Sequence, residues 1–198
     1  MDDRDEMGEA NVHILQLFDD EEARCDAVTA FSSFLLKQSG AVYLLTTVER
    51  GRLLDERLRG LGFDVGGLKA RGQLCVVDAS EALASFMAST VPDATRFLES
   101  VGGVVSEMEA HYPRVGVYEE MADVLWACGN RYGALELESL WNDLMAAHKF
   151  TLLCGYAKER FASPEDKVYL RELCVLHERI ARASEDSTVR AGDYGFGR

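Results

Sequence analysis

Short apolar runs alternate along this chain with longer stretches in which apolar residues recur at helical spacing. Each run is too short and too evenly apolar for an amphipathic surface helix, and its Val, Ile, Tyr and Phe side chains suit a buried, pleated surface. Such alternation is typical of an α/β fold, in which a mostly parallel central sheet carries helices on both faces. The predicted strands span residues 12–18, 41–46, 74–77, 114–118 and 150–156. We therefore expect a sheet of about five or more strands.

The segments between the predicted strands carry signals for helix starts. Asp19 or Asp20 is the expected N-cap of the first helix, and the second helix follows Thr47. A last helix is expected to begin at Ser163 and to carry Ile180 on its apolar face. Two further helices are predicted at residues 121–128 and 131–148, where Gly129-Asn130 breaks the periodicity.

The length of 198 residues is typical of a single domain with a core of its own. We expect this domain to span residues 11–183. The acidic residues 1–10 and the tail at 184–198, which lacks apolar periodicity, are expected to be flexible.

The charge balance argues against polyanionic partners. Lys and Arg total 21 against 34 Asp and Glu, which gives a net charge of −13 and opposes attraction to nucleic acid or to anionic lipid. The chain begins with acidic residues rather than a signal sequence, and no apolar run approaches the roughly 20 residues of a membrane span. We therefore expect a cytoplasmic protein that binds neither nucleic acid nor membrane.

The cysteines lie far apart, with no CxxC pair and no spacing typical of a zinc site. They are expected to be small buried hydrophobes in a reducing compartment. From spacing alone, the sequence predicts no metal ligand and no cofactor. The five are Cys25, Cys75, Cys128, Cys154 and Cys174.

Carboxylates follow several of the predicted strands. In open α/β sheets, ligands bind beyond the carboxyl ends of the strands, and these ends carry Asp19, Asp20, Asp78, Glu119 and Glu120. The carboxylates either cap helices on a solvated face or form a rim that binds a ligand or cation. Where a phosphate-binding loop would lie, the chain has four consecutive acids and neither GxxxxGK[ST] nor GxGxxG. A nucleotide site is therefore not expected.

The sequence offers little support for catalysis, because it has no nucleophile elbow and no paired metal-binding histidines. No catalytic residue is predicted. The aromatic residues either pack in the core or line an apolar ligand pocket; they are Trp126, Trp141, Tyr118 and Tyr156. His13, inside the first strand, is either a satisfied buried histidine or a ligand contact.

Two stretches of the sequence indicate a protein family more specifically than the composition does. They are HILQLFDDEEA from His13 and YEEMADVLWACGNRYGALELESLWNDLMAAHKFTLLCGYAKERF from Tyr118. Together they resemble the MEDS domain, a sensory domain named for methanogens, methylotrophs and the regulator DcmR. The resemblance covers about residues 11–181. The matching positions are His13, Gln16 and Phe18, then Glu120-Met121, Leu125-Trp126, Gly129-Asn130, Leu137-Glu138, Trp141-Asn142, Leu152-Leu153-Cys154 and Tyr156, and more weakly Leu176-His177-Glu178.

The resemblance implies a relative of the KaiC and RecA ATPases that has lost their phosphate loop. Glu119 departs from the family pattern, in which Gly precedes Glu-Met. The resemblance therefore does not determine the backbone conformation around Glu120. The resemblance further implies a sensor of a small, possibly hydrocarbon-derived compound that signals through a sensor histidine kinase, a response regulator or another regulator. Two alternatives remain, a non-sensing adaptor and a residual nucleotide hydrolase. The expected ligand-binding residues are His13, Gln16, Glu120, Trp126, Trp141, Cys154 and Tyr156.

Overall fold

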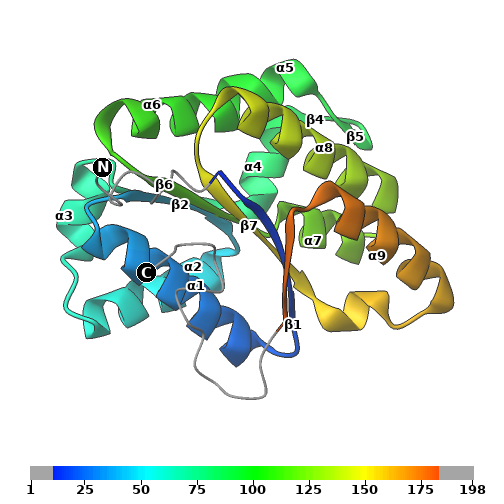
Figure 1. Cartoon of the computed structure of the whole chain (residues 1–198), viewed down its shortest axis with the longest axis horizontal. Helices are drawn as coiled ribbons and strands as arrows, with labels where there is room; N and C mark the ends of the chain where they lie inside the picture. The colour runs from blue at the N-terminus through cyan, green and yellow to red at the C-terminus, as the bar shows by residue number, and fades with distance from the viewer. Residues whose placement is uncertain (1–10, 183–198) are drawn as a thin grey trace, which may run out of the picture.

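A parallel six-stranded sheet forms the centre of residues 11–182, the part of the chain that the computed structural model describes (Figure 1). The strand order is β3-β2-β6-β7-β1-β8, and every neighbouring pair is parallel. The five predicted strands are confirmed, each within one residue at either end. The strands are β1 (His13–Phe18), β2 (Ala41–Thr46), β3 (Leu74–Asp78), β6 (Val115–Glu119), β7 (Thr151–Ala157) and β8 (Arg179–Arg182).

The edge strand β8 was not predicted. The last helix, α9 (Pro164–Leu176), ends before Ile180, which lies in β8 and not on the helix. The strand is short, and within the described part of the chain it pairs with β1 alone; the amide of Glu178 donates to the His13 carbonyl at 3.0 Å. Because this pairing depends on a strand more than 150 residues earlier, the local sequence carries little trace of it. The predictions for residues 1–10 and 184–198 lie outside the described part.

Three helices cover the face of the sheet drawn lowest in Figure 1. They are α1 (Glu21–Lys37), α2 (Val48–Gly60) and α3 (Val65–Ala70), of which α3 was not predicted. Asp20 caps α1 by accepting from the amide of Ala23 at 2.8 Å, and Thr47 caps α2 by accepting from the amide of Arg50 at 3.3 Å. Both predicted starts are therefore confirmed, with Asp20 as the N-cap of α1.

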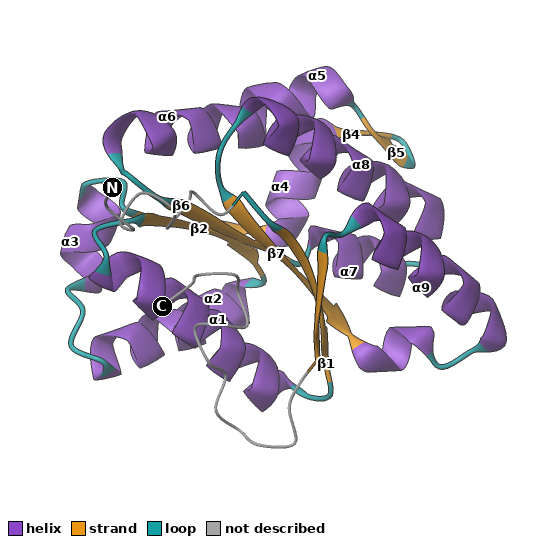
Figure 2. Ribbon diagram, in the orientation of Figure 1, coloured by secondary structure: helices purple, strands orange, loops and turns teal. Residues whose placement is uncertain are grey.

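The remaining helices cover the opposite face (Figure 2). The predicted break at Gly129 is confirmed, because this residue has a φ of +78° between α7 and α8. The elements on this side are α4 (Ala79–Phe86), the hairpin β4 (Met87–Ala88) and β5 (Val91–Pro92), α5 (Ala94–Phe97), the π-helix η1 (Leu98–Gly102), α6 (Gly103–His111), α7 (Met121–Ala127), α8 (Arg131–Ala147), the 3₁₀-helix η2 (Lys158–Phe161) and α9.

The sheet separates two apolar cores. Along β1, Ile14 and Phe18 pack with α1, whereas Leu15 packs with the core under α8, as strand alternation requires. Across β7, Cys154 pairs in register with Leu15. Polar side chains on these strands therefore face either α1 or α8, and this division separates the candidate site residues. Within residues 11–182, no helix is both long and apolar enough to cross a membrane.

Candidate functional site

The acidic groups at the carboxyl ends of the strands differ in role. Asp20 caps α1, and Asp78 accepts from the amides of Ser80 and Glu81, each at 3.0 Å, at the start of α4. For these two carboxylates the capping interpretation is confirmed. Asp20 occupies the Ala23 amide at the N-terminus of α1, where a bound phosphate would be held.

Glu120 is instead the centre of a buried network of polar side chains. Its Oε1 accepts from the Thr46 hydroxyl at 3.0 Å and from the Thr47 amide at 2.5 Å, and its Oε2 accepts from the Tyr118 hydroxyl at 3.0 Å. Gly155 leaves room for this tyrosine, because a Cβ there would lie 2.7 Å from the Tyr118 hydroxyl. Both carboxylate oxygens of Glu120 are therefore engaged within the protein.

Two arginines neutralise this carboxylate. Arg24 of α1 lies 3.4 Å from Glu120 Oε2, and Arg50 of α2 also donates to that oxygen. Arg24 reaches Asp123 at 3.3 Å, and Arg50 makes a bidentate pair with Glu21 at 2.5 and 2.7 Å. Desolvation lowers the pKa of Arg50, but the carboxylates outweigh it and the net shift is upward. The network, here called the Glu120 network, ties α1, α2 and α7 to the end of β6.

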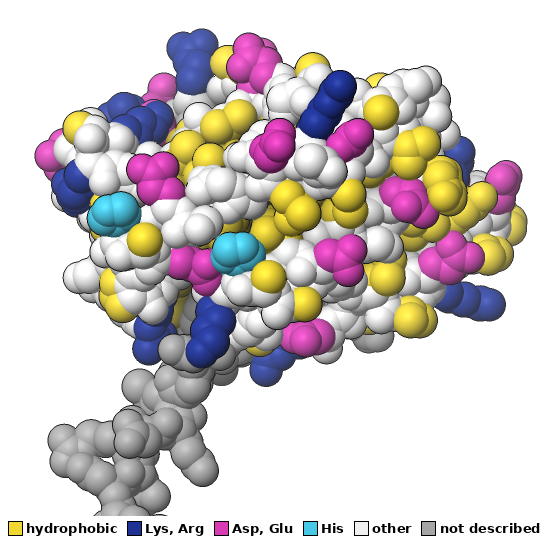
Figure 3. All heavy atoms as spheres, turned by 90° about the horizontal axis from the view of Figure 1, so that it is seen from above, with side chains coloured by type: hydrophobic (Ala, Val, Ile, Leu, Met, Phe, Trp, Pro, Cys, Tyr) yellow, Lys and Arg dark blue, Asp and Glu magenta, His cyan; other side chains and the backbone are white. Residues whose placement is uncertain are grey.

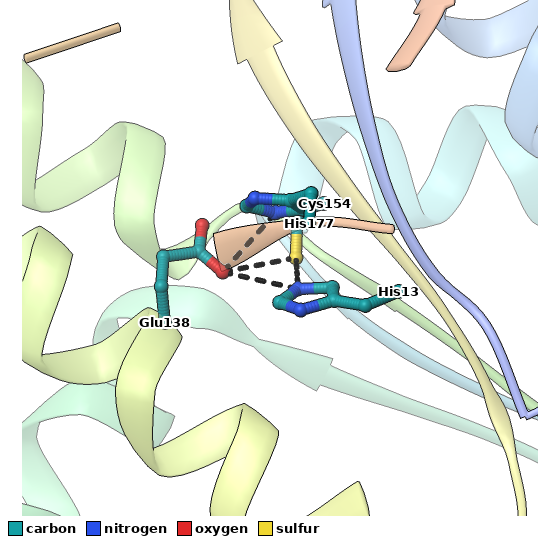
Figure 4. Close-up of side chains that lie close together, drawn as sticks. All are labelled: His13, Glu138, Cys154 and His177. Carbon is teal, nitrogen blue, oxygen red and sulfur yellow. Dashed lines mark hydrogen bonds and ion pairs between the residues drawn. The ribbon is translucent and has the colours of Figure 1, made fainter. Parts of the chain in front are cut away.

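A second polar group lies on the other face of the sheet, under α8 (Figure 4). His13 comes from β1, Cys154 from β7, Glu138 from α8 and His177 from the junction between α9 and β8. All four are buried, and their nearest donor atoms lie within 4.8 Å of one another. We call His13, Glu138, Cys154 and His177 the His/Cys cluster.

The distances within the His/Cys cluster are short. His13 Nε2 lies 3.1 Å from Cys154 Sγ and 3.2 Å from Glu138 Oε2. The Cys154 thiol donates to Glu138 Oε2 at 3.3 Å, and His177 Nε2 lies 3.4 Å from the same oxygen. The Tyr156 hydroxyl donates to Glu138 Oε1 at 2.6 Å. Glu138 therefore lies next to every other group of the cluster and accepts from the Cys154 thiol and the Tyr156 hydroxyl.

Neighbouring groups orient both imidazole rings. Asn142 donates from Nδ2 to the Leu176 carbonyl at 3.0 Å, which leaves its Oδ1 to accept from His13 Nδ1 at 2.9 Å. His177 Nδ1 donates to the Leu173 carbonyl at 2.7 Å. The Nδ1 protons of both histidines are thus committed outside the cluster, and both Nε2 atoms face into it.

Burial and charge set the protonation of the cluster. Burial alone would raise the pKa of Glu138, but His177 and His13 beside it hold that pKa far below its usual range. Burial raises the pKa of the Cys154 thiol and of the Tyr156 hydroxyl, and the Glu138 charge raises both further. Desolvation lowers the pKa of His177, but Glu138 outweighs it and the net shift is upward. Glu138 is therefore the anionic centre of a largely dry site.

Glu119 lies on the cluster side of β6 and is fully buried. Its Oε2 accepts from the amide of Ala122 at 3.2 Å, and Oε1 has no partner among the described residues. Burial and the nearby charge of Glu138 raise its pKa well above the usual range. Glu119 does not have a positive φ, so this departure from the family pattern requires no left-handed backbone.

The structure brings some of the predicted site residues together and separates others. His13, Cys154 and Tyr156 meet at Glu138, and Trp126 lies edge-on to Tyr156 with ring centroids 6.2 Å apart. Trp141 packs between Phe97 and Phe150. Gln16 follows the strand alternation to the α1 face, and Glu120 belongs to its own network there and at the strand end. The seven residues therefore do not form one site, and whether they bind a ligand stays a prediction.

Sequence reasoning assigned no role to Glu138 or His177, although both lie in segments that resemble the family. The available signal for Glu138 was a charged residue between Leu137 and Trp141 on the apolar face of a helix. His177 follows the last helix directly and gives no comparable signal. Only the packing of α9 on α8 brings its ring to 3.9 Å from that of His13, centroid to centroid.

A hollow of about 290 Å³ lies at the carboxyl ends of β2 and β3. Its wall includes Thr46, Gly51, Asp55, Lys69 and Asp78, and neither tryptophan nor Tyr156 lines it. This hollow is therefore not the apolar ligand pocket that the tryptophans and Tyr156 were offered to line.

Comparison with known proteins identifies the fold and the family. A KaiC-like protein from the hyperthermophilic archaeon Pyrococcus horikoshii OT3 has a similar structure, with a TM-score of 0.57 and 15% sequence identity over 91% of this chain and 76% of that one. At this identity the similarity concerns the fold alone. No curated protein matches the sequence. Residues 12–178 match the family described as the methanogen/methylotroph, DcmR sensory domain, MEDS. The chain therefore belongs to the MEDS family of sensory domains.

Proposed function

We propose that this domain senses a small, largely apolar compound in the cytoplasm and passes the signal to a separate regulator without catalysing a reaction. The hydrocarbon-derived class of compound comes from the family resemblance. The observation that carries the proposal is the way in which His177 closes the His/Cys cluster. This residue links α9 to β8, so a change at the cluster acts directly on the last described segment of the domain.

The segment formed by α9 and β8 makes fewer stabilising contacts than the central strands do. β8 has four residues and pairs with β1 alone, and Leu173 is the fully buried apolar side chain of α9. Elements with few buried apolar contacts open at a lower free energy than core strands do. Because His177 of this segment closes one side of the cluster, we expect a ligand that contacts Tyr156 or His13 to displace the segment. Different affinities for the closed and open arrangements would then shift their populations.

We propose that the partner is a sensor histidine kinase, a response regulator or another regulator that reads the position of this segment. Val175 of α9 is 85% exposed, and Ile180 of β8 is 49% exposed. A protein partner that packs on this segment would cover both side chains. The net charge of −13 supports a protein partner over nucleic acid or membrane. On the face shown in Figure 3, basic side chains are interspersed with acidic and apolar ones and form no continuous basic patch of the kind that attracts nucleic acid.

Ligand sensing can be tested by thermal shift with one-carbon, halogenated and short-chain hydrocarbon metabolites. A ligand at about 100 times its dissociation constant adds roughly 2.7 kcal/mol of apparent stability, so at least one compound should raise the melting temperature. Tyr156→Phe removes a hydroxyl at the cluster and should reduce this shift more than it lowers the unliganded melting temperature. Tyr112→Phe, whose hydroxyl donates to the exposed Arg71 carbonyl, is the matched control.

Glu120→Gln separates the two polar regions in the same assay. The variant should be less stable but should retain the ligand-induced shift, because Glu120 is engaged by Arg24 and Arg50 and not by the cluster. If no compound stabilises the domain while a kinase or regulator co-purifies from the native host, the adaptor interpretation replaces sensing.

The proposal that the domain is not a nucleotide hydrolase makes a separate prediction. ATP and GTP should bind no better than about millimolar, because Asp20 already caps the N-terminus of α1, where a phosphate would be held. Isothermal titration calorimetry with Mg²⁺ measures this affinity directly. Micromolar binding, or turnover of either nucleotide, would favour the hydrolase alternative.

A further inference from the structure

The donor atoms of the His/Cys cluster are arranged as a metal-binding site. We propose that His13, Glu138, Cys154 and His177 bind one divalent transition-metal ion of the zinc class. The four residues offer two imidazole nitrogens, one thiol sulfur and one carboxylate oxygen. The inference does not require the domain to sense a small molecule, and it can be tested without an organic ligand.

The distances fit four-coordinate zinc. Zn–N and Zn–O bonds of about 2.0–2.2 Å and a Zn–S bond of about 2.3 Å place the ligand atoms of a tetrahedral site roughly 3.3–3.6 Å apart. Four of the six separations in the cluster are 3.1, 3.2, 3.3 and 3.4 Å, and all six lie within 4.8 Å. Small side-chain movements would therefore complete the coordination, without rearrangement of the backbone.

The outer hydrogen bonds select the tautomer that a metal needs. A histidine that binds a metal through Nε2 usually donates its Nδ1 proton to a carbonyl or carboxylate, which fixes the ring and raises the basicity of the ligating nitrogen. His177 donates Nδ1 to the Leu173 carbonyl, and His13 donates Nδ1 to Asn142 Oδ1. Asn142 is itself held by the Leu176 carbonyl. Both rings thus present Nε2 to the centre of the cluster.

An unpartnered nitrogen points to the same centre. His177 is only 7% exposed, and its Nε2 has no hydrogen-bond partner with acceptable geometry among the described residues. The nearest charged atom is Glu138 Oε2, 3.4 Å away, which is also close to His13 Nε2 and Cys154 Sγ. A metal ion would satisfy all of these atoms together. Its binding would release the Cys154 thiol proton to solvent as the thiolate forms.

The donor set also indicates which ions would bind. Magnesium and calcium take oxygen ligands, whereas a mixture of imidazole, thiolate and one carboxylate suits zinc or cobalt. Four protein ligands leave no open position, which is typical of a structural ion and not of a catalytic one. The ion would connect β1, β7 and α8 to the junction between α9 and β8.

Metal content and cobalt spectroscopy of the untagged full chain test the proposal. We expect the purified protein to retain about one equivalent of zinc through dialysis. After removal of zinc with a chelator, Co²⁺ should produce the intense visible absorption of a tetrahedral complex and a thiolate-to-cobalt charge-transfer band. Cys154→Ser should abolish the charge-transfer band, while Cys25→Ser, which changes a buried cysteine of α1, should leave it intact.

A variant of Asn142, which orients His13 but is not a metal ligand, keeps the test informative if a ligand variant fails to fold. Asn142→Ala leaves all four ligands in place and should weaken zinc binding by about 10- to 100-fold, the range for such partners. Weak six-coordinate cobalt absorption without charge transfer in the folded wild type would overturn the proposal. A charge-transfer band that survives in folded Cys154→Ser, or is lost in Cys25→Ser, would overturn it as well.

Discussion

Replacement of Trp141 by alanine is expected to lower the free energy of unfolding by about 3–5 kcal/mol, the range for large aromatic residues removed from a core. Trp141 is fully buried, with its ring edge-on to Phe97 at a centroid distance of 5.1 Å and 6.1 Å from Phe150. Alanine would leave a cavity that these rigid rings cannot fill. The same substitution at Trp126, which is 4% exposed, should have an effect in the same range. Urea denaturation of the variants measures both losses.

Tyr132→Ala is the control for Trp141→Ala, because both residues lie in α8. The Tyr132 side chain is 61% exposed, and surface substitutions usually change stability by no more than about 0.5 kcal/mol. A loss below about 1 kcal/mol for Trp141→Ala would contradict the packing described above, because it would place the indole in the range of surface side chains.

Removal of the charge of Glu120 is expected to destabilise the domain by a similar amount, about 3–5 kcal/mol, because breaking one partner of a buried ion pair leaves the other uncompensated. In Glu120→Gln the side chain keeps its shape, but Arg24, only 4% exposed, loses one of its two carboxylate partners. Arg50 keeps Glu21. Chemical denaturation at neutral pH gives the loss in unfolding free energy.

An exposed pair provides the comparison. Glu22 is 75% exposed at its side chain and pairs with Arg57 at 2.7 Å, so Glu22→Gln should cost less than about 1 kcal/mol. A double variant, Glu120→Gln with Arg24→Met, should lose less than the sum of the two single variants, because both changes remove the same Glu120–Arg24 pair. Equal losses for Glu120→Gln and Glu22→Gln, or strict additivity in the double variant, would argue against a coupled buried network.

The strands of the central sheet were predictable because their signal is local. Strands in the middle of a parallel sheet are covered by helices on both faces and are therefore mostly apolar, so β1, β2, β3, β6 and β7 are recognisable in the sequence. Helix starts were readable for a related reason, since Asp20 and Thr47 bond to amides only three residues away. The edge strand β8 was not readable, because its pairing with β1 joins distant parts of the chain.

The candidate site was only partly predictable. His13 and Cys154 were predicted as site residues because they are polar or reactive groups within apolar strands that resemble the family. The predicted grouping also included Gln16 and Glu120, which the sheet separates from the cluster. A single sequence shows which residues lie in a strand, but not which helix covers a given face or which loop returns to it.

Glu119 and Glu120 show which properties follow from the sequence and which depend on the tertiary structure. The sequence by itself determined the α/β fold class, the order of the main elements and the end of β6 at these two carboxylates, since each depends on neighbouring residues. The tertiary structure alone decided their environments. Glu120 meets two arginines from α1 and α2, whereas Glu119, its neighbour on the chain, lies buried on the cluster side and forms no ion pair within residues 11–182. Strand alternation separates adjacent side chains, and the partners that surround them come from segments up to 96 residues away in sequence.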